Sequence, residues 1–158
     1  MVDDKAKRLV ALLKERGRTI ATAESLTGGR IAAAITAVPG SSGVFPGGIV
    51  SYCDRVKHQM LGVPMEMLEK YGAVSEPVAR AMAQGAAEQM RTDLAVSATG
   101  LAGPDGDGSG TLVGTVYLGL YMDGKVMCRR YLFDGERAEI QGKAVESALE
   151  FVLCMLEK

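Results

Sequence analysis

The spacing of apolar and polar residues predicts that helices and strands alternate along the first third of the chain. Lys5 to Arg16 places leucines on one helical face and is followed by Arg18 to Ala23, a short run of small and apolar residues typical of a buried strand. The alanine-rich stretch Gly29 to Ala37 predicts a second helix, which the next Pro-Gly pair must end. Gly47 to Tyr52 predicts a second strand, opened by glycines.

The middle of the chain continues the same alternation. Short helices are predicted over Asp54 to Leu61 and over Pro64 to Tyr71, the latter with its proline at the favoured first helical position. Ser75 is a typical N-cap for a longer helix that runs to about Arg91 and has a proline in its first turn. Leu94 to Thr99 then predicts another buried strand, which ends in a glycine-rich loop.

The last third predicts a hairpin followed by a helix. Val113 to Tyr121 and Val126 to Phe133 read as strands on either side of Asp123-Gly124, a two-residue hairpin signal. A long amphipathic helix follows Arg137. Early alternation followed by a hairpin indicates an α/β protein with a mixed sheet covered by helices. Neither a repeat nor a linker interrupts residues 1–158, so we expect a single domain.

Composition narrows the class of protein. A length of 158 residues with 47% hydrophobic content suits one globular domain with a full core. The formal net charge of −1 argues against a sequence-independent nucleic-acid binder, which needs a basic surface to displace phosphate counterions. No apolar run reaches the length of a membrane span, and the first residues lack the apolar stretch of a signal peptide, so we expect a cytoplasmic protein that binds no membrane.

Histidine and cysteine are too scarce for several common kinds of site. The single histidine, His58, makes a transition-metal centre or a Ser-His-Asp triad a poor hypothesis, and no carboxylate or thiolate cluster replaces it. The three cysteines are scattered, which indicates reduced, structural thiols. We therefore expect neither a metal nor a cofactor.

The turn Glu24 to Gly29 is the most informative segment. It places Ser25 between a predicted strand and a predicted helix, where the hydroxyl can serve as a helix N-cap or as a nucleophile. A nucleophilic serine needs a base, and a lysine whose pKa is lowered by burial can supply one. Lys57 follows the second strand, and parallel neighbouring strands would bring it near Ser25, although a solvated lysine is the commoner state.

Two further features could bind an anion. The segments Gly40 to Gly43 and Ser97 to Pro104 combine hydroxyl groups with glycines, so they can present backbone N–H groups to a phosphate or an oxyanion. Arg137 precedes the last helix, where a guanidinium can bind a phosphate or carboxylate with two hydrogen bonds. Taken singly, the loops can be plain turns and the arginine a surface residue.

Together, several short motifs resemble the CinA C-terminal-domain family over almost the whole chain. In chain order they are Thr22-Ala-Glu-Ser-Leu-Thr-Gly-Gly29, Val38-Pro-Gly-Ser-Ser42, Gly48-Ile-Val-Ser-Tyr52, Gly72-Ala-Val-Ser-Glu-Pro-Val-Ala79, Thr99-Gly-Leu-Ala-Gly-Pro-Asp-Gly106 and Val113-Gly-Thr-Val116. The family includes deamidases that convert nicotinamide mononucleotide to nicotinate mononucleotide and ammonia. The resemblance implies a three-layer α/β/α sandwich, a metal-free amidase and self-association into a homo-oligomer.

The resemblance also assigns roles to single residues. Ser25 would be the nucleophile and Lys57 its base. Residues of the quoted motifs would line the site for a small-molecule nucleotide, and Arg137 would face its phosphate; the lining residues are Thr27, Gly28, Ser42, Tyr52, Thr99 and Gly100. The quoted motifs are those of the C-terminal domain, so the pyrophosphatase activity of the N-terminal domain of full-length members is not expected from these residues.

This sequence departs from the family pattern at a few positions. Cys53-Asp54 stands where many members carry Ser-Asn, and Gln141 stands where an arginine is common, one helical turn past Arg137. The alternative to an amidase is a non-catalytic module of the same fold that binds a mononucleotide for sensing or assembly. In that case the Ser25 hydroxyl would only cap the following helix.

Overall fold

A computed structural model describes residues 1–158 and contains one five-stranded sheet with the strand order β2-β1-β3-β4-β5. Strands β1, β2 and β3 are parallel, whereas β4 and β5 run antiparallel to their neighbours, so the sheet is mixed as predicted. The strands are β1 (Ile20–Glu24), β2 (Gly48–Val50), β3 (Leu94–Gly100), β4 (Thr115–Met122) and β5 (Lys125–Leu132).

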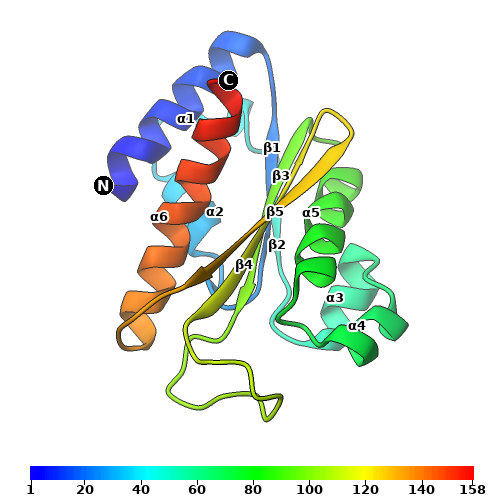
Figure 1. The fold of residues 1–158 in the computed structure, drawn as a ribbon. Coiled ribbons are helices and arrows are strands. Elements are labelled where there is room, and N and C mark those ends of the chain that lie inside the picture. Colours follow the sequence, from blue (N-terminus) through cyan, green and yellow to red (C-terminus); the bar gives the residue numbers. More distant parts are fainter.

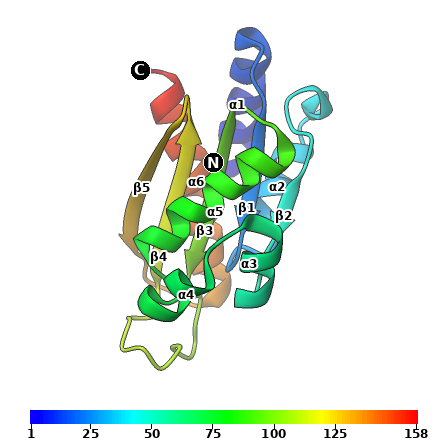
Figure 2. The same cartoon turned by 90° about the vertical axis from the view of Figure 1, so that its right-hand side faces the viewer.

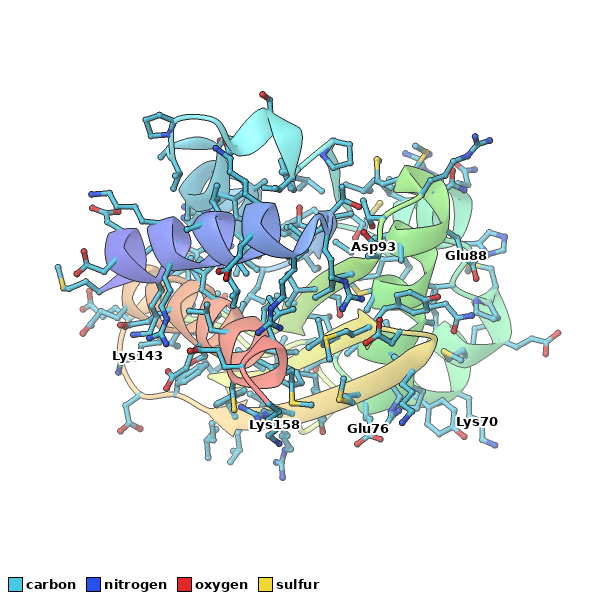
Figure 3. All side chains as sticks on the ribbon, turned by 90° about the horizontal axis from the view of Figure 1, so that it is seen from above. Lys70, Glu76, Glu88, Asp93, Lys143 and Lys158 are labelled. Atoms are coloured by element: carbon cyan, nitrogen blue, oxygen red, sulfur yellow. The ribbon has the colours of Figure 1, made fainter.

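Helices cover both faces of this sheet (Figure 1). One layer consists of α1 (Val2–Arg16), α2 (Arg30–Thr36) and α6 (Arg137–Leu156), and the other of α3 (Asp54–Leu61), α4 (Met65–Tyr71) and α5 (Glu76–Met90). Seen from above, Lys143 and Lys158 lie on the α6 side and Glu76 and Glu88 on the α5 side (Figure 3). The predicted α/β/α sandwich is thus confirmed. None of the helices has the length and apolar character needed to cross a membrane.

The predicted elements all form, with small shifts at their ends. The Asp123-Gly124 turn has positive φ at both residues, 55° and 76°, as a type I′ hairpin turn requires. Ser75 is the N-cap of α5, although its hydroxyl donates to the carbonyl of Gly72 rather than accepting from the helix. The placement of Pro64 was wrong by one residue: it is the extended N-cap of α4, and the first helical position is Met65.

The core is divided by the sheet into two unequal parts. A cluster of 25 buried apolar residues lies between the sheet and the α1/α2/α6 layer, and one of 10 lies beneath α5, α3 and α4. All five residues of β1 are buried because β1 is covered on both faces and paired on both edges. The strand that leads into the Ser25 turn is therefore among the best fixed parts of the molecule.

Glycine at position 85 sets the position of α3 against α5. A Cβ atom there would lie 1.9 Å from the carbonyl oxygen of Leu61, the last residue of α3. Because only a residue without a side chain permits this approach, α3 can lie close along α5, beside the carboxyl ends of the parallel strands (Figure 2). The position of α3 matters because this helix carries Lys57.

We expect Gly85→Ala to destabilise the protein by about 1–3 kcal/mol, since the added methyl group must displace backbone of α3. Gly142→Ala is the matched control, because a Cβ atom at this exposed position of α6 meets nothing within 4 Å. That substitution should stabilise the helix by ~0.5–1 kcal/mol. Chemical denaturation of both variants measures the difference, and equal effects of the two substitutions would contradict the packing role of Gly85.

Candidate active site

The candidate site lies at the carboxyl ends of the three parallel strands. The turn of residues 25–29 follows β1, Ser51 and Tyr52 follow β2, and the segment of residues 101–114 follows β3. This last segment projects beyond the lower end of the sheet in Figure 1, next to the first turn of α6. Segments far apart in sequence therefore meet at the edge where α/β proteins place their ligands.

The turn after β1 is held by Glu24, a residue to which the sequence patterns gave no role. Its buried carboxylate accepts hydrogen bonds from the backbone N–H groups of Ile31 and Ala32, at 2.8 and 3.0 Å, in the first turn of α2. Glu24 therefore provides the capping interaction that the alternative hypothesis assigned to Ser25. The prediction that the Ser25 hydroxyl caps this helix is wrong, and the N-cap residue by position is Gly29.

The Ser25 hydroxyl instead faces Lys57. The Lys57 Nζ atom lies 2.8 Å from Ser25 Oγ and 2.7 Å from the carbonyl oxygen of Ser51. Lys57 comes from α3, and only 1% of its surface is exposed, so it is among the largest fully buried side chains of the protein. Two elements that are separate in sequence thus bring a hydroxyl and an amine into direct contact.

Burial lowers the pKa of the Lys57 ammonium below the ordinary value of a lysine, because a charged amine loses its hydration there. The negative charge of Asp54, one helical turn earlier in α3, opposes this shift, and so does Cys53. No carboxylate lies within 4.0 Å of the amine to form an ion pair. The neutral amine, which can accept a proton, is therefore favoured by the burial of this side chain.

Backbone N–H groups stand free directly after the serine. The N–H of Ser25 donates to the carbonyl of Ala98 in β3, at 2.9 Å, which fixes the serine backbone to the sheet. The N–H groups of Leu26 and Thr27 have no hydrogen-bond acceptor within the chain. A nucleophilic residue followed by an uncommitted N–H is the arrangement that stabilises an oxyanion in acyl transfer.

Two adjoining cavities open at this place. The smaller, which we call the inner chamber, has a volume of about 230 Å³ and contains Ser25 and Lys57 in its wall. The larger, the outer chamber, has a volume of about 980 Å³ and is lined in part by α2 and α6. Leu26, Tyr52, Ala102 and Arg137 line both. The pair of chambers offers room for a ligand of nucleotide size, with one end at the serine.

Most of the predicted site residues are brought together here. Tyr52 and Arg137 lie at the border of the two chambers, where the Arg137 guanidinium donates to the Tyr52 hydroxyl. Gly28 lines the outer chamber, and Thr99 and Gly100 line the inner one. The Thr99 hydroxyl donates to the carbonyl of Ala73 at 2.8 Å, so this side chain holds the wall rather than pointing a free hydroxyl at a ligand.

Two predicted lining residues lie elsewhere. Thr27 is fully buried and lines neither chamber, and its hydroxyl has no hydrogen-bond partner, so this side chain does not contact a ligand in either chamber. Ser42 is exposed in the 3-10 turn η1 (Ser41–Gly43), which follows α2 at the other end of the sheet, where Val44 accepts a hydrogen bond from the start of β1. Within this chain, Ser42 does not contribute to the cavity.

Three residues join the site that residue types alone did not single out. Glu24 orders the turn, Asp54 lines the inner chamber beside the lysine, and Arg30 lines the outer chamber. A glutamate at a strand end, four residues before a glycine pair that opens a helix, is a detectable signal, because its carboxylate can bind free N–H groups of the first helical turn. For Arg30 no such signal exists, since its place depends on the fold of the turn.

Comparisons with known proteins agree with the family resemblance of the sequence motifs. Residues 2–156 match the family described as the CinA C-terminal domain. A CinA-like protein of Citrifermentans bemidjiense is 49% identical over 145 residues, which are 92% of this chain and 35% of that protein. The CinA-like protein of Gemmatimonas aurantiaca is 44% identical over 148 residues, 94% of this chain and again 35% of the relative. The chain thus spans about a third of the length of the curated relatives it matches.

A solved structure agrees over its whole length. The competence/damage inducible protein CihA of Agrobacterium tumefaciens superimposes with a TM-score of 0.94 at 38% identity, covering 99% of this chain and 96% of that one. With the sequence match over nearly all residues, this similarity establishes that the chain belongs to the CinA C-terminal domain family.

Proposed function

We propose that this protein is an amide hydrolase that uses Ser25 as nucleophile and Lys57 as base, and that its substrate is nicotinamide mononucleotide. The observation that carries the proposal is the 2.8 Å contact between the hydroxyl and a buried amine, in the wall of a cavity. A buried lysine with a lowered pKa, next to a serine, is the arrangement by which a lysine activates a nucleophile. The substrate is taken from the resemblance to the family's deamidases and from the distribution of charge described below.

The first half of the reaction forms an acyl-enzyme. Neutral Lys57 takes the proton of Ser25 while Ser25 Oγ attacks the carboxamide carbon of the substrate. The Lys57 amine also donates a hydrogen bond to the carbonyl oxygen of Ser51, 2.7 Å away. The free N–H group of Leu26, a residue that lines both chambers, stabilises the oxyanion, a contribution of ~3 kcal/mol per donor in other enzymes. The ammonium of Lys57 then returns the proton to the leaving nitrogen, and ammonia departs.

The second half regenerates the serine. A water molecule takes the place of ammonia, Lys57 removes its proton, and the hydroxide attacks the ester carbon. The new tetrahedral intermediate uses the same N–H group; as its bond to Ser25 Oγ breaks, the Lys57 ammonium returns the proton to that oxygen, which leaves nicotinate mononucleotide and the free serine hydroxyl. The Lys57 amine is the only acid–base group of the protein that either half requires.

The charges around the two chambers match the two ends of this substrate. Carboxylates line the inner chamber at Asp54, Asp105 and Asp107, where the cationic pyridinium ring would lie. Guanidinium groups line the outer chamber at Arg30 and Arg137, where the phosphate would lie. A ligand with a cation beside its amide and an anion at its far end is therefore favoured in one orientation, with the amide toward Ser25.

The first test replaces the nucleophile. Ser25→Ala should lower ammonia release from nicotinamide mononucleotide by more than about a thousandfold, because the residual catalysis would depend on binding and the oxyanion donors alone. Ser147→Ala, on α6 and outside both chambers, is the matched control and should retain full activity. Retained turnover in the Ser25 variant, with a fold unchanged by circular dichroism, would refute the proposal.

The pH dependence tests the base. The kcat/KM should rise with pH as Lys57 loses its proton, and the rise should lie below the ordinary lysine value of about 10.4 because burial lowers this pKa. Asp54→Asn removes a charge that favours the ammonium, so the rise should move to lower pH. Full pH–rate profiles of both proteins measure the shift, and a rise that stays in place or moves upward would argue against Lys57 as the titrating group.

A further inference from the structure

The outer chamber carries two guanidinium groups that have no carboxylate partner. Arg30 stands at the first position of α2 and Arg137 at the first position of α6, and both line this chamber. Neither forms an ion pair within the chain. The single carboxylate of the lining, Glu136, accepts a hydrogen bond from a backbone N–H in the capping box of α6. Two like charges are therefore gathered in one cavity, and neither is paired with a carboxylate within 4.0 Å.

Arg30 is held over the turn rather than left free in solvent. Its Nη1 atom donates to the carbonyl of Thr27 at 3.0 Å. A Cβ atom on Gly28 would lie 3.1 Å from the same Nη1, so the glycine leaves room for the guanidinium to fold back. Because only Nη1 has an acceptor within the chain, the other N–H groups of Arg30 remain available to a ligand in the chamber.

Arg137 is anchored in the same manner from α6. Its Nη1 atom donates to the carbonyl of Gly103 at 2.6 Å, and its Nη2 atom donates to the Tyr52 hydroxyl. Gln141, one turn further along α6, lines the chamber as a neutral amide and donates to the carbonyl of Leu26 at 2.9 Å. The positive charge of the chamber is thus supplied by Arg30 and Arg137 alone.

The first turn of α2 does not offer free backbone N–H groups to an anion in this chamber. The backbone N–H groups of Ile31 and Ala32, in the first turn of α2, are already occupied by the carboxylate of Glu24. A guanidinium offers planar pairs of N–H donors that match the oxygens of a phosphate, and two of them can share a dianion. Because each guanidinium is already held by a hydrogen bond within the chain, ordering the two side chains around an anion would cost less conformational entropy.

We propose that Arg30 is a specificity-determining residue that, together with Arg137, selects substrates carrying a phosphate monoester. The proposal rests on the proposed function for the kind of ligand, a nucleotide whose amide lies at Ser25. It predicts that the phosphate contributes to binding through Arg30, and that the same ligand without its phosphate binds independently of this residue.

The test uses a ligand pair that differs only in the phosphate. Nicotinamide mononucleotide and nicotinamide riboside are titrated by calorimetry into the full chain carrying Ser25→Ala, which prevents turnover. Adding Arg30→Gln should weaken mononucleotide binding about tenfold or more, as expected for a lost hydrogen bond to a charged group, and leave riboside binding unchanged. Arg130→Gln, an exposed arginine on β5 outside both chambers, is the matched control and should change neither affinity.

The outcomes separate this proposal from the proposed activity. Equal weakening of both ligands by Arg30→Gln, or no weakening of the mononucleotide, overturns the role of Arg30 even if the protein releases ammonia. If the protein with Ser25 intact releases no ammonia while the Arg30 dependence of mononucleotide binding is observed, the amidase proposal falls and the phosphate contact stands.

Discussion

Burial of the Lys57 amine is the constraint on which the rest of the site depends. An ammonium ion taken out of water without a carboxylate partner is costly, and the group responds by favouring its neutral form. The two hydrogen-bond partners at 2.8 and 2.7 Å, a hydroxyl and a carbonyl, are neutral and satisfy an amine without fixing its charge. The packing that hides the side chain is therefore also what would make it a base.

The contact between Lys57 and Ser25 is fixed from two sides without any ligand. On one side, Glu24 binds the first turn of α2, and the serine backbone is bonded to β3, so the turn cannot shift relative to the sheet. On the other side, Gly85 lets α3 pack against α5 with backbone in contact, which sets how far the lysine reaches. A pair prepared in this way requires little rearrangement before a reaction, which is how positioning lowers a barrier.

Local patterns were sufficient for the order of elements, the mixed sheet and the proximity of Ser25 and Lys57, because these follow from periodicity, turn residues and the parallel pairing of neighbouring strands. They failed where a residue type has several common uses. Serine is a frequent N-cap, yet here the carboxylate of the preceding Glu24 binds the N–H groups of the first helical turn. The position of Ser42 depends on the path of the chain after α2. Arg30 folds back over Gly28, which has a positive φ and no side chain to obstruct the guanidinium. Composition does not reveal this conformation.

The difference in hydration between the two ends of the cavity explains why they carry different basic residues. At the inner end a lysine is suitable, because burial can remove its proton and leave a base. At the outer end the side chains of Arg30 and Arg137 remain exposed, and a guanidinium offers planar pairs of N–H donors to an anion. Exchanging the two residue types would place a guanidinium, which cannot act as a base, in the interior, and a flexible ammonium without planar donor pairs at the outer end. Solvent access thus decides both which residue transfers a proton and which residues hold an anion.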